Sequence, residues 1–312
     1  MIGKAQIEHR YSFFKPDSTG QKIDGDDFYQ LGHFPDTAAR MRFYKTHAFK
    51  LARQALDKLD LAAIKADITH VIVTSCTGFY APGLDLQIVE HYGLKTETER
   101  TLIGFMGCQA AMNGMKLARY IVLSTPTAKV LMVNLELCTI HLQETDQIEQ
   151  LLSYLIFADG CAASLISAEP HGLALESFRC TVLPRSRDQI AWDIGNTGFD
   201  MVLSGEVPAT IASAIPGMQQ AILGSHHLAD IRYWALHPGG RSILDAIQKA
   251  FALPDTAMNP SRKILRDYGN MSSATIMFVL KDILEAPAGE SRGCAMGFGP
   301  GVSLESMLFH KI

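Results

Sequence analysis

Three polar residues that lie far apart in the chain could together carry out acyl transfer. Cys108 is a possible nucleophile, His237 a possible base and Asn270 a possible amide donor, and each lies within two residues of a glycine, in GFMGC, HPGG and GNMSS. A thiol that forms a covalent intermediate needs a base to take its proton and a donor to stabilise the developing negative charge. The three residue types therefore predict covalent catalysis through Cys108.

The expected surroundings of Cys108 favour a reactive thiolate. Unpaired N–H groups at a helix N-terminus and a neighbouring imidazolium both lower the pKa of a cysteine. Asn270 can stabilise negative charge, but it supplies no proton at neutral pH. This combination fits the decarboxylation of a malonyl thioester to an enolate, followed by carbon–carbon bond formation. It fits hydrolysis poorly, because hydrolysis needs an activated water.

Each of these residues also has a purely structural interpretation. Cys108 could pack as a small residue in a strand-to-helix turn, His237 could be a hydrogen-bonded core residue, and Asn270 could cap the helix that follows it. The remaining cysteines, at positions 76, 138, 161, 180 and 294, show no CxxC spacing, so most are expected to be reduced and buried. The eleven histidines contain no HExxH motif, so no metal site is predicted.

Apolar strands and amphipathic helices alternate along the whole chain. In the first half, strands are expected at 70–74, 129–135 and 162–167, and helices at 37–59, 84–92, 109–124 and 146–155. In the second half, strands are expected at 173–183, 233–236, 294–298 and 302–309, and helices at 207–223, 242–251 and 271–284. This order predicts an α/β layered protein, and the similar halves 1–170 and 171–312 indicate an internal duplication.

The composition describes a compact protein with a large core, since 47% of its 312 residues are hydrophobic and 19% are charged. A net charge of −4 without a long basic run argues against a nucleic-acid partner. The chain contains no run of about 18 apolar residues, so no membrane span is predicted. The N-terminus lacks the apolar core of a signal peptide, so we expect a cytoplasmic protein.

At the level of whole motifs, the chain resembles the chalcone and stilbene synthase family, the type III polyketide synthases of the thiolase-like fold. The matching stretches are, in order, THVIVTSCTGFYAPGLD, GFMGCQAAMNGMKLA, IFADGCAASLI, YWALHPGGRSILDAI, YGNMSSATIMFVL and GFGPGVSLESMLFH. SCTGFYAPG and GFMGC are closer to bacterial members than to plant members. The resemblance implies a homodimer of αβαβα subunits that uses an acyl-CoA starter and a malonyl-CoA extender, with no further cofactor.

The resemblance also implies roles for individual residues. It makes Cys108 the nucleophile, His237 the base and donor, and Asn270 the amide donor. Phe157 would be the gate between a coenzyme A tunnel and the cavity, and Lys4 would contact the coenzyme A phosphates. The other positions expected at the cavity are Cys76, His141, Met201 and Ser272, together with a wall loop of Phe298, Gly299 and Pro300.

The chain departs from the plant pattern at several of these positions. Met201 stands where plant members have a second gating phenylalanine, Ala81 where they have a methionine that enters the neighbouring cavity, and Cys76 replaces a threonine. These changes argue against plant-like aromatic starters. Lys4 matches the last residue of a basic cluster that contacts the coenzyme A phosphates in the family. The rest of that cluster, and the first strand and helix of the family, would precede Met1. We therefore expect that the first sheet lacks an element, that residues 1–35 replace it, or that the chain is a shortened form.

The predicted function is that of a type III polyketide synthase. An acyl-CoA starter would be loaded on Cys108, and decarboxylative Claisen condensation with malonyl-CoA would give a pyrone, a resorcinol or a similar polyketide. One alternative is a single-round ketoacyl synthase or acyltransferase that takes carrier-protein substrates. Another is a catalytically silent thiolase-fold partner, which has no chemical need for the three polar residues.

Overall fold

Two four-stranded sheets form the framework of the part of the chain that the computed structural model describes, residues 5–287 and 289–312. The first sheet has the order β2 (Glu99–Gly104), β1 (Ile68–Ser75), β3 (Lys129–Leu137) and β4 (Asp159–Ile166). Its strands are parallel except for the antiparallel pair β3–β4. The second sheet has the order β5 (Leu173–Val182), β10 (Ser303–Lys311), β9 (Ser291–Gly299) and β8 (Tyr233–Leu236). In this sheet only β8 and β9 run parallel.

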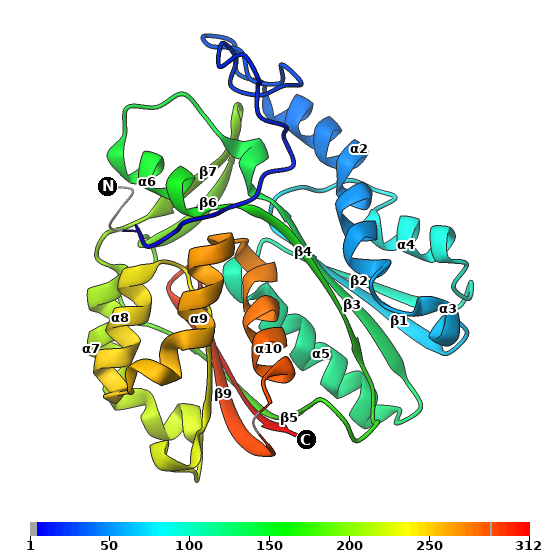
Figure 1. The fold of residues 1–312 in the computed structure, drawn as a ribbon, viewed down its shortest axis with the longest axis vertical. Coiled ribbons are helices and arrows are strands. Elements are labelled where there is room, and N and C mark those ends of the chain that lie inside the picture. The colour runs from blue at the N-terminus through cyan, green and yellow to red at the C-terminus, as the bar shows by residue number, and fades with distance from the viewer. Residues whose placement is uncertain (1–4, 288) are drawn as a thin grey trace.

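Helices α5 (Ala110–Ser124) and α10 (Thr275–Glu285) lie between the two sheets (Figure 1). Met112 and Met115 of α5 share one buried core with Val279 and Leu280 of α10 and with side chains from both sheets. Ile72 of β1 points into this core, whereas its neighbours Val71 and Val73 point to the opposite face of the sheet. This alternation is the two-residue period of a strand that is buried on both faces.

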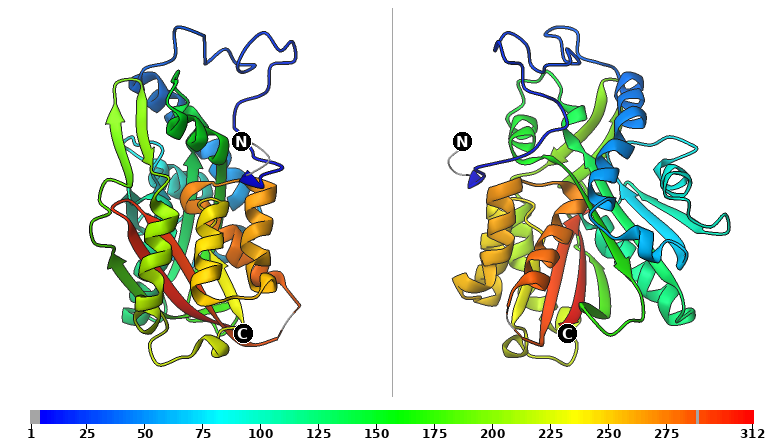
Figure 2. Two further views of the ribbon diagram at one scale, coloured as in Figure 1. Left: turned by 90° about the vertical axis from the view of Figure 1, so that its left-hand side faces the viewer. Right: turned by 45° about the vertical axis from the view of Figure 1, so that its right-hand side comes forward.

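The outer faces of the sheets are covered by two further groups of helices (Figures 1 and 2). On the first sheet these are α2 (Thr37–Leu56), α3 (Leu61–Ile64) and α4 (Leu84–Tyr92). On the second sheet they are α7 (Val207–Leu223), α8 (Arg241–Phe251) and α9 (Asp255–Tyr268). The result is the five-layer αβαβα arrangement that the resemblance implies.

Most predicted elements are present, and α4, α7 and β8 have the expected bounds. Short 3₁₀ turns precede the two central helices: η1 (Gly107–Gln109) carries Cys108, and η4 (Ser272–Ala274) follows Asn270. Five helices and strands were not expected, namely α3, β2, α9 and the two strands of a hairpin, β6 (Ile190–Gly195) and β7 (Gly198–Leu203). That hairpin belongs to neither sheet. The remaining elements are α6 (Ile148–Ile156), η2 (Cys138–His141) and η3 (Leu228–Asp230).

The segment before α2 supplies no strand to the first sheet among residues 5–36. It folds instead around aromatic side chains, and the rings of Phe14 and Phe28 lie 4.6 and 4.7 Å from the ring of Phe43 on α2. The buried carboxylate of Asp24 accepts the N–H groups of Asp26, Phe28 and Tyr29, which fixes the turn. Among the described residues, no helix combines the length and the apolar character that a membrane crossing requires.

Candidate active site

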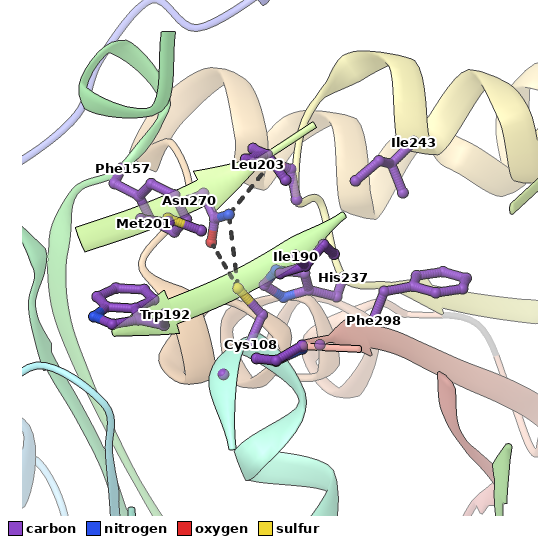
Figure 3. A pocket seen from close by; sticks show the side chains of 14 residues that line it. Cys108, Phe157, Ile190, Trp192, Met201, Leu203, His237, Ile243, Asn270 and Phe298 are labelled. Carbon is purple, nitrogen blue, oxygen red and sulfur yellow. Dashed lines mark hydrogen bonds between the residues drawn. The ribbon is translucent and has the colours of Figure 1, made fainter. Parts of the chain in front are cut away.

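Cys108, His237 and Asn270 line one cavity. Cys108 lies on η1 after β2, His237 follows β8, and Asn270 lies between α9 and η4. Figure 3 shows the three side chains converging around the sulfur of Cys108 from these separate elements. The expected meeting of a thiol, an imidazole and a carboxamide is therefore present in the structure.

The Asn270 amide is held in one orientation. Its Oδ1 accepts the backbone N–H of Ser272 at 2.9 Å and the hydroxyl of Thr275 at 3.3 Å. Its Nδ2 donates to the carbonyl of Gly239 at 3.3 Å and lies 3.9 Å from Sγ of Cys108. A backbone N–H needs an acceptor and a carbonyl needs a donor, so these partners fix which end of the amide is nitrogen. Oδ1 lies 4.0 Å from the same sulfur, so both ends of the amide are near Cys108, and Nδ2 is the end that can donate a hydrogen bond to charge developing there.

His237 is a buried, neutral imidazole. Its backbone N–H donates to the carbonyl of Met296 at 2.8 Å, which holds the residue against β9. Neither ring nitrogen has a hydrogen-bond partner among the residues that the structure describes. Burial lowers the pKa of His237 to about 3, because the charged form loses its hydration. The ring is thus free to accept a proton at one step and to donate a hydrogen bond at another.

Cys108 is a thiol rather than the expected thiolate. Burial raises the pKa of Cys108 to about 11, and the neighbouring Ser272 and Asn270 side chains lower it by less. The prediction of a lowered pKa is wrong in this structure because desolvation outweighs the helix N-terminus and because the imidazole beside the sulfur carries no charge. Attack by this sulfur would therefore need a base to take the thiol proton, and the neutral His237 ring is the base that lies beside it.

Five of the predicted cavity residues line the cavity: Phe157, Met201, Phe298, Gly299 and Pro300. Four apolar residues that were not predicted also line it, namely Ile190, Trp192, Leu203 and Ile243. Three of these four belong to the β6–β7 hairpin. Apolar residues at alternate positions on both sides of Gly195-Asn196-Thr197-Gly198 are the signal that could have predicted this hairpin.

Cys76 does not line this cavity, but it contacts Gly107, which does. Its Sγ accepts the N–H of Gly107 at 3.1 Å, and its own N–H donates to the Glu136 carboxylate at 2.9 Å. A thiol can accept hydrogen bonds weakly, so this position braces the turn of the nucleophile. The predicted cavity residue is thus a structural neighbour of Cys108.

His141 and Ser272 are also outside the lining of the cavity. The imidazole of His141 pairs with the carbonyl of Thr77 at 2.7 Å, accepts the N–H of Phe199 at 3.1 Å and stacks on the Phe199 ring. These contacts use both of its nitrogens and make it part of the scaffold. Ser272 lies beside the sulfur, since its side chain lowers the pKa of Cys108. Lys4, the expected coenzyme A contact, lies outside the described residues.

Glu136 is a buried carboxylate that the sequence did not single out. It accepts the hydroxyl of Thr77 at 2.9 Å and that of Ser273 at 2.6 Å, in addition to the N–H of Cys76. These bonds join the ends of β1 and β3 to η4. Burial raises the pKa of Glu136 to about 7, and the same hydrogen bonds oppose that shift. The described residues contain no group of three His, Cys, Asp or Glu side chains placed to hold a metal ion.

Family models match nearly the whole chain. The N-terminal domain of the chalcone and stilbene synthases matches residues 34–170, and the C-terminal domain matches residues 174–312. The chain belongs to the chalcone and stilbene synthase family.

Relatives of this chalcone and stilbene synthase family member are type III polyketide synthases. The alpha-pyrone synthesis polyketide synthase-like Pks18 of Mycobacterium tuberculosis is 34% identical over 289 residues, which are 88% of this chain and 73% of Pks18. The structure of PKS-I from the brown alga Ectocarpus siliculosus superposes with a TM-score of 0.87 at 33% identity, covering 99% of this chain and 87% of that one. The 1,3,6,8-tetrahydroxynaphthalene synthase of Streptomyces coelicolor gives a TM-score of 0.81 at 30% identity, covering 88% and 81%. The chain therefore has the thiolase-like fold and belongs to a class of condensing acyltransferases.

Proposed function

We propose that the protein condenses an acyl-CoA starter with malonyl-CoA and that Cys108, His237 and Asn270 carry the chemistry. The observation that carries this proposal is the fixed Asn270 amide, whose donor lies 3.9 Å from the nucleophilic sulfur. A donor at this point can stabilise charge on a thioester oxygen. The family and its relatives support the same reaction class.

The first step is the loading of the starter. Sγ of Cys108 attacks the thioester carbonyl, and His237 takes the thiol proton as the carbon–sulfur bond forms. The bond to coenzyme A then breaks, and the proton passes from His237 to the departing coenzyme A thiolate. Loading leaves an acyl-Cys108 thioester, free coenzyme A and a neutral imidazole, which agrees with the lowered pKa of His237.

The second step is decarboxylation and condensation. Malonyl-CoA loses carbon dioxide, and the electron pair of the broken carbon–carbon bond forms an enolate. The Asn270 amide and the neutral His237 ring donate hydrogen bonds to the enolate oxygen, and one such donor contributes about 2.7–4 kcal/mol to the transition state. The enolate carbon attacks the acyl-Cys108 carbonyl, and the bond to the cysteine sulfur breaks, so the chain is extended by two carbons. The departing thiolate takes a proton from solvent, which restores the Cys108 thiol.

The cavity walls favour an apolar starter group. Apart from the three reacting side chains and the indole N–H of Trp192, the side chains that line the cavity are apolar. A starter hydroxyl buried there without a partner would cost about 1–3 kcal/mol. We propose coenzyme A thioesters as the only small molecules required, with Lys4 at the coenzyme A phosphates and release of the product as a pyrone, a resorcinol or a similar ring.

We further propose that the protein acts as a homodimer in the cytoplasm. The edge strand β2 exposes Leu102, and the adjacent helix α5 exposes Tyr120 and Leu123, with exposed fractions of 45%, 54% and 61%. An unpaired strand edge beside apolar side chains is a surface that proteins usually cover. A second copy of the same chain is the occupant that we propose.

The test is an incubation of the protein with malonyl-CoA and a panel of short, long and aromatic acyl-CoAs. We expect release of carbon dioxide and free coenzyme A, together with an acyl adduct on the intact protein that Cys108→Ala abolishes. Acyl carrier-protein donors in parallel reactions distinguish the single-round alternative. A folded protein that forms no adduct and releases no carbon dioxide with any donor would refute the proposal.

A further inference from the structure

We propose that Arg10 is a positioning residue that holds the Phe157 segment and Asn270 in the arrangement required for decarboxylation. This inference rests on the proposed function, since it assigns a residue to one step of that reaction. It starts from the N-terminal strap, residues 8–13, which crosses the molecule between α6 and α9 (Figure 1).

The strap is hydrogen-bonded to both sides of the seam that it crosses. The N–H groups of Glu8 and His9 donate to the carbonyl of Arg266 on α9 at 2.8 and 2.9 Å. On the other side, the N–H of Asp159 on β4 donates to the carbonyl of Tyr11 at 2.8 Å. The strap therefore has a defined position on each side of Arg10.

Arg10 binds the C-terminal end of α6. Its Nη1 donates to the carbonyl of Tyr154 at 2.5 Å and to the carbonyl of Phe157 at 2.8 Å. Carbonyls in the last turn of a helix lack an intrahelical partner, and a cation beside them also interacts favourably with the helix dipole. The guanidinium thus fixes the backbone on both sides of Ile156, the last residue of α6.

The same stretch of backbone is joined directly to Asn270. The N–H of Asn270 donates to the carbonyl of Ile156 at 2.9 Å, and the N–H of Ala158 donates to the carbonyl of Asn270 at 2.9 Å. The Ile156 carbonyl lies between the two carbonyls that Arg10 binds, and the Ala158 N–H belongs to the same peptide group as the Phe157 carbonyl. A movement of residues 154–158 would consequently displace Asn270 as well as Phe157.

Gly269 shows how closely these segments approach one another. A Cβ placed on this residue would lie 2.9 Å from the carbonyl oxygen of Ile156 and 3.2 Å from Cβ of Arg10. The strap, the end of α6 and the Asn270 turn are therefore in mutual contact, with no room for a methyl group between them. Displacement of one of the three is transmitted to the others.

Loss of Arg10 should affect the two chemical steps unequally. Loading uses the Cys108 thiol on η1 and the His237 ring after β8, and Arg10 donates to neither segment. Decarboxylation also requires the Asn270 amide at the enolate oxygen. A small misplacement of a catalytic group can cost up to about a hundredfold in rate, so we expect Arg10→Ala to slow decarboxylation by about ten- to a hundredfold.

The experiment compares Arg10→Ala and Arg10→Lys with the wild type and with His9→Ala. His9 is a matched control because its backbone N–H, and not its side chain, makes the hydrogen bond of the strap to Arg266. We would measure acyl adduct formation on Cys108 by intact mass, carbon dioxide release from malonyl-CoA, the melting temperature, and amide hydrogen exchange of residues 154–158 and 270.

We expect near wild-type loading, slowed carbon dioxide release and faster exchange of residues 154–158 in Arg10→Ala, with partial recovery in Arg10→Lys and no change in His9→Ala. Carbon dioxide release equal to that of the wild type, or an equal loss of both steps, would overturn the role of Arg10. Amide hydrogen exchange of residues 154–158 that is the same in Arg10→Ala as in the wild type would also overturn the role of Arg10, even if the wild type has no activity. A wild type that neither loads nor decarboxylates would instead refute the proposed function.

Discussion

Sγ of Cys76 accepts the backbone N–H of Gly107 at 3.1 Å, so the end of β1 braces the turn that presents the nucleophile. Gly107 has a φ of +69°, a conformation that favours glycine. A Cβ on this residue would lie 2.4 Å from Cδ of Pro300 in the wall loop. The turn is therefore restricted by its conformation and by its neighbours at the same time.

Substitution of Gly107 by alanine should lower both stability and turnover. The left-handed conformation costs an L-residue about 1–2 kcal/mol, and the clash with Pro300 adds to that cost. Thermal unfolding and carbon dioxide release would be measured beside Gly205→Ala, a position where a Cβ meets no atom within 4 Å. Equal melting temperatures and equal rates of carbon dioxide release in the two variants would show that the turn before Cys108 is not restricted at Gly107.

Asn270→Asp should separate loading from decarboxylation. The carboxylate keeps an acceptor for Ser272 and Thr275 but loses the donor that faces Cys108. We expect carbon dioxide release to fall by about 10²–10³-fold, the usual effect of removing one donor to a developing oxyanion, while the acyl adduct still forms. Asn196→Asp, in the exposed turn of the hairpin, is the matched control. Rapid carbon dioxide release by Asn270→Asp would rule out the amide as an essential donor.

The pH dependence of alkylation should report the protonated thiol. Because burial raises the pKa of Cys108 to about 11, the thiolate fraction rises about tenfold for each pH unit throughout the neutral range. The iodoacetamide reaction of the Cys108 peptide, followed by mass spectrometry, should therefore keep accelerating from pH 7 to pH 10. A cysteine peptide of ordinary pKa would level off near pH 9. A flat rate between pH 6 and pH 9 would instead indicate a thiolate–imidazolium pair.

Glu136→Gln should change how stability depends on pH. The pKa of Glu136 is raised by burial from 4.5 to about 7, so the folded state binds a proton that the unfolded state releases. This contribution to stability is fully present below about pH 4.5 and is lost as pH rises through 7. The free energy of unfolding of the variant relative to the wild type should therefore increase by up to about 3 kcal/mol between pH 4.5 and pH 8.

Urea denaturation at the two pH values measures this difference for Glu136. The buried Asp159, whose pKa is also raised by burial, is present in both proteins, so its contribution cancels. A difference in unfolding free energy that stays constant with pH would show that the pKa of Glu136 is not raised in the folded protein.

Leu102→Lys should disrupt the proposed homodimer. A lysine on an edge strand opposes strand pairing, because it places a charge where an apolar contact would form. Light scattering after size-exclusion chromatography should give twice the subunit mass of 34.2 kDa for the wild type and the single mass for the variant. Leu284→Lys, at a leucine of similar exposure near the end of α10, should remain dimeric. A monomeric wild type would refute the dimer.

The elements that sequence patterns predicted well have strong local signals. Helix α7 has a proline in its first turn and Gly224 after its last residue, and the short apolar run of β8 ends at His237. Strand β2 lacked such a signal, because at the edge of the sheet it exposes Glu99, Arg100 and Thr101. Helix α9 was missed because it is strongly polar and contains Pro260, which opposes an interior helical position.

The candidate site was predictable in its residue types but not in its ionisation. Glycine-marked junctions identified Cys108, His237 and Asn270, because close backbone approach needs glycine. The pKa values of Cys108 and His237 depend on how completely the folded protein removes water from them, and a linear motif carries no such information. The contact between Arg10 and residues 154–157 spans more than 140 positions, so no local pattern could show it.

One wall of the reaction chamber can vary without disturbing the rest of the protein. Ile190 pairs with Leu203 and Trp192 with Met201 across the β6–β7 hairpin, and all four side chains face the cavity. This hairpin is not hydrogen-bonded to either sheet as a strand. Substitution of both residues of one cross-strand pair would therefore reshape the chamber and leave the strand pairing of both sheets unchanged. Evolution could diversify products in this fold by altering two facing side chains together, with little loss of foldability.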